Sequence, residues 1–179
     1  MTSAKELFDR HGVKQLGYYV ESIEESAELM HEAMGVGPFL DSGVTHFDAC
    51  DVRGEKVPLD IRTALGHMDD IQIELIEIST PGPDPYHEMG RFGLHHFCVY
   101  VDDVDVAVAD LVDAGMSVAM LLQSGSGQNI AYVDARKELG QYIELCTPND
   151  RLWETVKGLH DQADPAGPAL IPISALMGK

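Results

Sequence analysis

The sequence contains the same pattern twice. Residues 15–24 and residues 96–105 each begin with a polar residue, continue as an apolar strand and end in an acidic turn. Each copy also closes with a similar strand, in which one glutamate stands between apolar neighbours: Glu74 in the first copy and Glu144 in the second. Because a repeated sequence builds a repeated structural unit, the chain is expected to fold as two similar halves.

The hydrophobic period within each copy changes in the same order. In the first copy, residues 13–20 alternate as a strand, residues 21–34 carry apolar residues at helical spacing up to Gly35, and three strands follow at about 39–50, 59–67 and 70–78. In the second copy, we expect a strand at 95–101, a helix at 104–114, and strands at 117–123, 129–134 and 141–146, with a hairpin turn at 124–127. Each copy is therefore a βαβββ module.

Breaker residues and changes of pattern suggest the boundaries. Residues 1–80 contain a short leading helix at 3–11 and the first module, and the proline-rich segment 81–92 is a linker between the copies. Residues 93–148 are the second module, and residues 149–179 form a helix from about 150 to 162, capped by Asp150, and a proline-rich tail with little regular structure. We expect the fold class to be α+β, with tandem βαβββ modules forming a curved mixed sheet around a cleft.

The charge balance excludes several classes of partner. The 179 residues include 30 acidic and 12 basic residues, for a net charge of -18, which repels nucleic acids and anionic lipid surfaces. We find no signal segment and no apolar run of the length that a membrane span needs, so we expect a cytoplasmic protein. The three cysteines are far apart in sequence and form no C-x-x-C pair, which argues against a disulfide framework or a thiolate zinc site.

The first and last strands of the two copies supply four possible metal ligands: Gln15, Glu74, His96 and Glu144. A lone histidine or glutamate in a strand is more often structural or solvent-facing, but the repeat makes a joint site the favoured interpretation. One amide, one imidazole and two carboxylates suit one divalent Lewis acid per site, such as zinc, nickel, cobalt, manganese or magnesium. Such a site can stabilise an enediolate or enolate while a carboxylate moves a proton, with Glu144 as the mobile base and Glu74 as a ligand or second base.

The chain resembles the vicinal oxygen chelate superfamily over residues 13–148. The residues that carry the resemblance are Gln15-Leu16-Gly17-Tyr18, Gln72-Ile73-Glu74-Leu75, Gly93-Leu94-His95-His96-Phe97 and Gly140-Gln141-Tyr142-Ile143-Glu144. The order Gln, Glu, His, Glu is similar to glyoxalase I, whereas the Gly-Leu-His-His segment is similar to methylmalonyl-CoA epimerase, a pattern from which the chain departs at Gln15 and Glu74. The resemblance implies a metal-dependent isomerase or lyase acting on a small oxygenated substrate.

Other members of the same superfamily provide alternatives. Bleomycin-resistance proteins bind an antibiotic without metal, and the acidic chain is compatible with such a cationic ligand. An antibiotic-modifying or dehalogenating enzyme is a further alternative, whereas the iron dioxygenases need two histidines where only His96 is available. The resemblance also implies a homodimer.

Three neighbouring features are expected to be structural. His95 should point to the opposite side of its strand from His96, because strand side chains alternate. Tyr86, His87 and Glu88 lie in the linker, where a solvated loop is the expected structure. The apolar stripe of the last helix, which includes Leu152 and Trp153, is expected to pack on its own chain.

Overall fold

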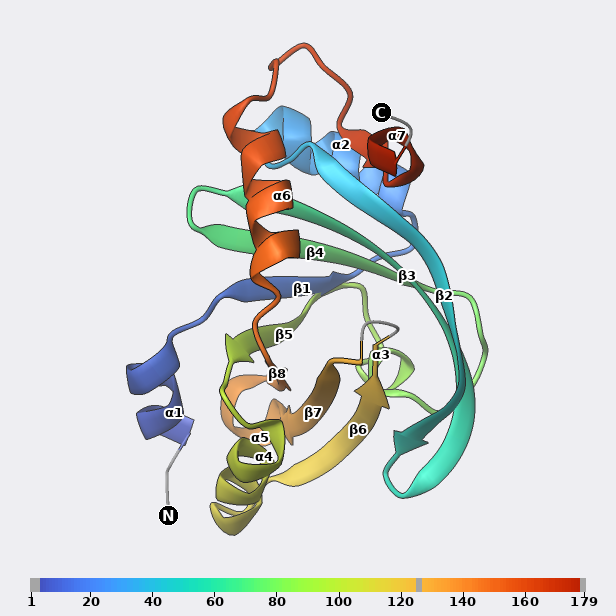
Figure 1. Ribbon diagram of the computed structural model, residues 1–179. Helices are drawn as coiled ribbons and strands as arrows, with labels where there is room; N and C mark the ends of the chain where they lie inside the picture. Colours follow the sequence, from blue (N-terminus) through green and yellow to red (C-terminus); the bar gives the residue numbers. More distant parts are fainter. Residues whose placement is uncertain (1–3, 125–126, 178–179) are drawn as a thin grey trace.

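The computed structural model of the protein describes residues 4–124 and 127–177. The strands are β1 (Gln15–Tyr19), β2 (Phe39–Val52), β3 (Glu55–Met68), β4 (Ile71–Ile78), β5 (Gly93–Tyr100), β6 (Ser117–Gln123), β7 (Asn129–Ala135), β8 (Gln141–Cys146) and β9 (Leu170–Pro172). The helices are α1 (Ala4–His11), α2 (Ile23–Met34), α3 (Pro85–Glu88), α4 (Val104–Asp113), α5 (Arg136–Leu139), α6 (Asp150–Asp161) and α7 (Ser174–Met177). This mixed α+β architecture confirms the predicted fold class (Figure 1).

The strands form one strongly curved mixed sheet in the order β3-β4-β1-β5-β8-β7-β6-β2-β9. Because β2 also pairs with β3, the first eight strands of this order close on themselves, and β9 adds to β2 outside the closure. The two repeats meet where β1 pairs with β5 in antiparallel orientation. Both halves of the sheet therefore come from one chain, and their first strands lie side by side at its centre (Figure 1).

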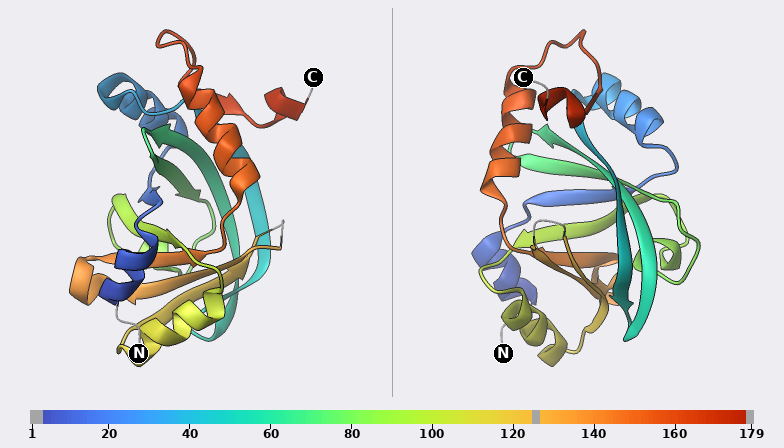
Figure 2. Two further views of the ribbon diagram at one scale, coloured as in Figure 1. Left: turned by 60° about the vertical axis from the view of Figure 1, so that its left-hand side comes forward. Right: turned by 45° about the vertical axis from the view of Figure 1, so that its right-hand side comes forward.

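Helices α2 and α4 cover the outer surface of the two halves (Figure 2). Ile23 and Ala27 of α2 pack against β4 residues, and Val104 and Leu111 of α4 pack against β7 and β8 residues. The sequence sets the ends of α2 locally: the Ser22 side chain accepts a hydrogen bond from the Glu25 backbone NH group, and the chain turns out of the helix at Gly35 with a φ of 68°. With the outer faces covered, the remaining side chains of the central strands point into the curved interior.

Helix α6 lies across the chain's own sheet, as predicted from its apolar stripe. Val156, Leu152 and Leu159 pack against Leu40 and Leu65 of β2 and β3. On the same helix, the Trp153 ring contacts His67 edge-on at 4.6 Å between ring centroids and lies 5.8 Å from the Tyr100 ring. The helix thereby walls one side of the curved interior.

The tail contains two short elements, β9, which pairs in parallel with β2, and α7, which follows it. Two local expectations are wrong. The linker contains the short helix α3, and Asn149 rather than Asp150 caps α6 by accepting from the Leu152 backbone NH group. Of the predicted turn at 124–127, residues 125 and 126 lie outside the described part of the chain. No helix in the described ranges is long and apolar enough to cross a membrane.

Candidate functional site

The two glutamates face the interior because the apolar residues on either side of each one pack on the outer face of the sheet. Strand side chains alternate, and the residues on either side of each glutamate pack under α2 or α4: Ile73 and Leu75 in β4, Ile143 and Leu145 in β8. Glu74 and Glu144 therefore point into the same curved space from opposite halves of the sheet. Glu144 does not face solvent, since only 5% of its surface is exposed.

The imidazole of His96 lies between these two carboxylates. Its Nε2 atom is 3.2 Å from Oε2 of Glu144 and 3.6 Å from Oε2 of Glu74. One ligand-type atom from each of the three residues can be chosen so that all lie within 4.8 Å of one another. Nε2 is fully buried but has no hydrogen bond of good geometry among the described residues. Two carboxylates that converge on an imidazole nitrogen without a hydrogen bond form a set of three ligand atoms that can hold a cation.

Strand register makes Gln15 the counterpart of His96. Gly17 of β1 pairs with Glu74 of β4 in the first half, and Cys98 of β5 pairs with Glu144 of β8 in the second. Gln15 and His96 each stand two residues before these partners, so the four predicted residues obey the twofold relation of the repeat. Gln15 is buried and lines a cavity together with both glutamates.

The amide of Gln15 is partly engaged. Its Nε2 atom donates a hydrogen bond to Oε1 of Gln72 at 3.0 Å, and the Gln72 amide nitrogen lies 3.3 Å from Nε2 of His67. The amide oxygen is the atom of Gln15 that could ligate a cation. The structure thus groups Glu74, His96 and Glu144 closely, with Gln15 on the wall of the same space.

Gly17 makes room for the His96 ring. A Cβ atom at position 17 would lie 2.0 Å from Cε1 and 2.2 Å from Nε2 of His96, far inside contact distance. Any side chain here would push the imidazole away from the two carboxylates. The repeat pattern by itself assigns no role to this glycine. Its position two residues after Gln15 is the sequence feature that could have indicated one.

His95 does not lie on the opposite side of the strand, and the prediction from alternation is wrong at this position. Gly17 pairs with His96 and Tyr18 pairs with Leu94, so His95 is the extra residue of a β-bulge. A bulge lets two successive side chains share one face. The His95 ring is stacked between Tyr86 and Tyr142 at centroid distances of 4.4 and 4.8 Å, and its Nδ1 atom lies 3.1 Å from Nδ1 of His96.

Burial controls the protonation of these groups. Desolvation, followed by repulsion from Glu144, raises the pKa of Glu74 well above its usual range. Desolvation also raises the pKa of Glu144, against hydrogen bonds from Tyr132 and Cys98 that lower it. Burial lowers the pKa of His96, so that its imidazole is neutral. Two carboxylates that repel each other beside a neutral imidazole fit a divalent cation, whose charge would relieve the repulsion.

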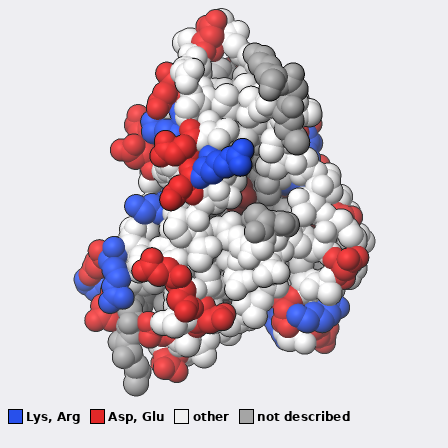
Figure 3. All heavy atoms as spheres, in the orientation of Figure 1, with Lys and Arg blue, Asp and Glu red and all other residues white. Residues whose placement is uncertain are grey.

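Cavities of about 170 Å³ each extend on two sides of the glutamate pair. One is largely apolar and includes Phe47, Ile61 and Leu122, whereas the other is rich in amide and hydroxyl groups, including those of Gln128 and Asn149. Both cavities share Thr63, Glu74, Ile130 and Glu144, which makes them two arms of one cleft. None of the described lining residues is lysine or arginine. Figure 3 shows acidic and basic side chains mainly in the left-hand half and at the lower right of this face.

The linker contributes to the cleft rather than being a solvated loop. Tyr86 is 1% exposed, lines the apolar arm and donates a hydrogen bond from its hydroxyl to the Tyr132 hydroxyl at 3.0 Å. Asp84 caps α3 by accepting from the Tyr86 and His87 backbone NH groups. This cap fixes the direction from which Tyr86 enters the site.

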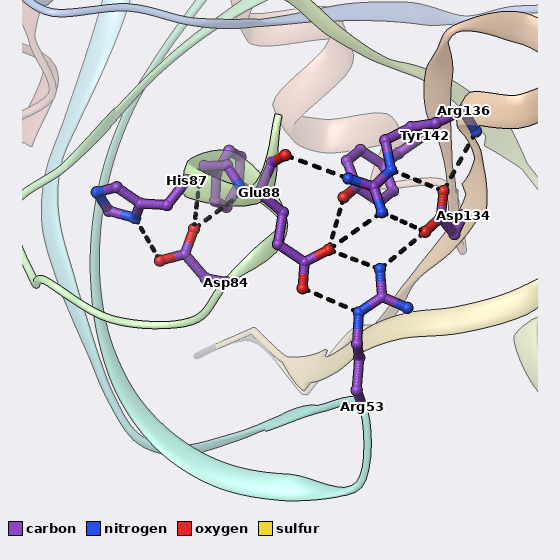
Figure 4. A network of polar contacts seen from close by, with 8 residues as sticks. Arg53, Asp84, His87, Glu88, Asp134, Arg136 and Tyr142 are labelled. Atoms are coloured by element: carbon purple, nitrogen blue, oxygen red, sulfur yellow. Dashed lines mark hydrogen bonds and ion pairs between the residues drawn. The ribbon is translucent and has the colours of Figure 1, made fainter. Parts of the chain in front are cut away.

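An ionic network holds the linker against the second half of the sheet (Figure 4). Glu88 accepts hydrogen bonds from Arg53 at 2.6 and 2.9 Å, from Arg136 at 3.2 Å and from the Tyr142 hydroxyl at 3.1 Å. Asp134 pairs with both arginines at 2.8 and 2.6 Å. Since the Tyr142 ring also stacks on His95, the network supports the aromatic stack behind His96.

Two cysteines that are far apart in sequence meet beside Glu144. The sulfur atoms of Cys98 and Cys146 are 3.5 Å apart, and Cys98 Sγ lies 3.3 Å from Oε1 of Glu144. The sequence predicts no disulfide framework, and all three cysteines are free, but this pair is in contact. Only the pairing of β5 with β8 brings them into contact.

Comparison with solved structures finds the same fold at low sequence identity. A hypothetical protein from Bacillus halodurans aligns with a TM-score of 0.57 and 16% identity, covering 78% of this chain and 96% of its own. Methylmalonyl-CoA epimerase from Mycobacterium tuberculosis aligns with a TM-score of 0.56 and 18% identity over 80% and 92% of the two chains. A variant epimerase from Streptomyces coelicolor, in complex with 2-nitronate-propionyl-CoA, aligns with a TM-score of 0.50 and 18% identity over 75% and 95%.

Comparison with curated proteins finds no significant match. A family model, however, matches residues 14–132, about two thirds of the chain. The matched range includes Gln15, Glu74 and His96 and ends before Glu144. The chain therefore belongs to the Glyoxalase/Bleomycin resistance protein/Dioxygenase superfamily.

Proposed function

We propose that this protein is a divalent-metal-dependent isomerase or lyase that removes a proton from a carbon beside a carbonyl group and returns it. The observation that carries this proposal is the convergence of Glu74 and Glu144, from equivalent strands, on Nε2 of His96. Buried carboxylates without a cation are unfavourable, so a metal-free role gives no physical reason for keeping both.

Glu74, His96 and Glu144 would hold the ion, with the amide oxygen of Gln15 as the fourth donor. The fit rests on the unsatisfied Nε2 atom of His96 and on the raised pKa values of both carboxylates. An oxygen-rich set with one imidazole favours zinc, nickel, cobalt, manganese or magnesium. When bound, such an ion supplies Lewis-acid stabilisation to substrate oxygens that gain negative charge.

The glutamates would perform the proton transfer. A carboxylate that lies beside the reacting carbon can take its proton and return it. Glu144 is the proposed mobile base, which reaches the cleft from β8. Glu74 is the proposed ligand or second base on the other side of the cleft.

The cleft favours a substrate without phosphate groups. Its described lining offers amide, hydroxyl and apolar groups but no lysine or arginine, so an anionic tail would meet no positive charge. A small hydroxyketone, hemithioacetal or short thioester with one apolar and one polar end fits both arms. The S. coelicolor epimerase is in complex with 2-nitronate-propionyl-CoA, whereas the described cleft lining of this chain offers no lysine or arginine for the phosphates of such a molecule.

The alternative is metal-free binding of a small molecule, as in resistance proteins of the same superfamily. The acidic net charge, and a cleft whose described lining has two glutamates but no lysine or arginine, favour a cationic or neutral ligand for that role. A homodimer and a cytoplasmic location remain predictions from the sequence.

Metal content and proton exchange together test the proposal. Elemental analysis of untagged protein should find close to one divalent ion per chain, and the ion should be lost in His96→Ala and Glu144→Ala. The metal-loaded protein in heavy water should exchange the hydrogen beside the carbonyl in a panel of small hydroxyketones, and Glu144→Gln should not. Glu138→Gln, an exposed glutamate, is the matched control. Wild-type protein that stays metal-free after incubation with all five ions contradicts the proposal and favours the binding alternative.

A further inference from the structure

Glu144 faces two groups of ligands with its two oxygen atoms. Oε2 points to Nε2 of His96 at 3.2 Å, whereas Oε1 lies 3.3 Å from the sulfur of Cys98. Cys98 in turn lies 3.5 Å from Cys146, sulfur to sulfur. Cys98, Cys146 and Glu144 therefore form a second cluster that touches the first without using His96 or Glu74.

We propose that this cluster is a separate binding site for a thiophilic cation of the zinc and cadmium class, held by the two sulfurs and by Oε1 of Glu144. Two thiolates that bind one tetrahedral zinc ion at about 2.3 Å are about 3.7 Å apart. The observed sulfur separation is close to that value and is far longer than the ~2.05 Å of a disulfide bond. Each thiol would give up its proton as the ion binds.

The surroundings fit an ion that enters from the cleft. Cys146 lines the polar arm together with Gln15 and Glu144, so the cluster opens toward the space through which substrate would pass. Cys98 is completely buried behind it.

Ligand softness separates the two sites. The site at His96 offers oxygen and nitrogen atoms and accepts hard ions such as magnesium or manganese as well as zinc, whereas the site at Cys98 offers sulfur and prefers thiophilic ions. A thiophilic ion would engage Glu144 and withdraw it from proton transfer. This inhibitory consequence rests on the proposed function, but the binding itself does not.

Cadmium binding to the reduced full-length protein tests the proposal. Wild-type protein should develop the ultraviolet charge-transfer absorption of a thiolate bound to cadmium, and its X-ray absorption spectrum should contain two sulfur neighbours per ion in this site. His96→Ala should keep the absorption, because it changes only the first site. Cys98→Ser and Cys146→Ser should each lose most of it, while Cys50→Ser, which changes the other buried cysteine, should keep it.

The outcomes separate this site from the proposed enzyme. Cadmium bound by oxygen and nitrogen atoms alone, or absorption that survives both Cys98→Ser and Cys146→Ser, overturns the thiophilic site. Absorption that disappears in His96→Ala also overturns it, because the sulfurs would then belong to the first site. The spectrum of the wild-type protein decides the matter even if a cysteine variant does not fold. A positive result stands whether or not the protein exchanges protons with any substrate.

Discussion

Nδ1 of His95 lies 3.1 Å from Nδ1 of His96, and the two imidazole rings meet at a right angle. Each neutral ring has one donor and one acceptor nitrogen, so one of the two Nδ1 atoms carries the shared proton. If His96 carries it, Nε2 of His96 presents a lone pair toward Glu74 and Glu144, as a metal ligand must. His95 is therefore a positioning residue that can fix the tautomer of His96.

Two variants of His95 separate its polar role from its stacking role. His95→Phe keeps an aromatic ring between Tyr86 and Tyr142 but removes the partner of Nδ1, and it should weaken binding of a divalent ion by about 10–100-fold. His95→Asn keeps a polar atom near the position of Nδ1 and should bind the ion more tightly than His95→Phe. Calorimetric titration with zinc or manganese measures both affinities. Equal affinity for wild type and His95→Phe would show that the hydrogen bond does not position His96.

Gly17→Ala should lower the affinity for the divalent ion although it changes none of the ligands. The new Cβ would lie 2.0 Å from Cε1 of His96, so the ring must leave its place between the carboxylates. We expect at least a tenfold loss of metal affinity in calorimetric titration, together with a lower melting temperature.

Gly158→Ala is the matched control for this change. Gly158 lies inside α6, where a Cβ would meet nothing closer than 3.8 Å. Alanine in a helix interior is favoured over glycine by about 0.5–1 kcal/mol, so this variant should be slightly more stable and should bind the ion normally. Normal metal affinity in Gly17→Ala would contradict the role assigned to the glycine.

The repeat and the strand alternation account for what could be predicted from the sequence. The repeat identified the strands that carry Glu74, His96 and Glu144. Strand alternation then explains the direction of the two glutamates, because their apolar neighbours pack under α2 and α4. Helix α6 was equally predictable from its apolar stripe. These features depend only on residues near one another in the chain.

The remaining features depend on contacts between distant residues. The bulge at His95 is set by the pairing of β5 with β1 and breaks the alternation that placed His95 on the other face. Cys98 and Cys146 meet only through the register of β5 with β8. The strand β9 is three residues long and ends in Pro172, so it has no periodicity to detect and forms because β2 offers a free edge.

Glu88→Gln should loosen the linker. Hydrogen bonds from Arg53, followed by other groups of the network, lower the pKa of Glu88. A lowered folded-state pKa contributes stability at neutral pH that is lost as pH falls through that value. The variant should lose about 1–3 kcal/mol of unfolding free energy at pH 7, as expected for hydrogen bonds to a charged group, and the difference from wild type should shrink below about pH 4.

Chemical denaturation across this pH range measures the effect of Glu88→Gln. Asp9→Asn is the control, since Asp9 forms an exposed ion pair with Lys5 in α1 and should change stability by no more than about 0.5 kcal/mol. A constant difference between Glu88→Gln and wild type at all pH values would indicate a packing effect rather than a charged network.

The effect of Glu74→Gln on stability should change sign when metal is added. Burial and the Glu144 carboxylate raise the folded-state pKa of Glu74, so the metal-free protein binds an extra proton relative to the unfolded chain and loses stability as pH rises above about 4.5. Glutamine carries no charge at pH 7, so metal-free Glu74→Gln should be more stable than wild type at this pH. With saturating zinc or manganese the order should invert, because only the wild type gains the full binding energy of the ion. Thermal melting with chelator and with metal tests both halves, and a variant less stable than wild type without metal would mean that Glu74 is held by a partner other than a cation.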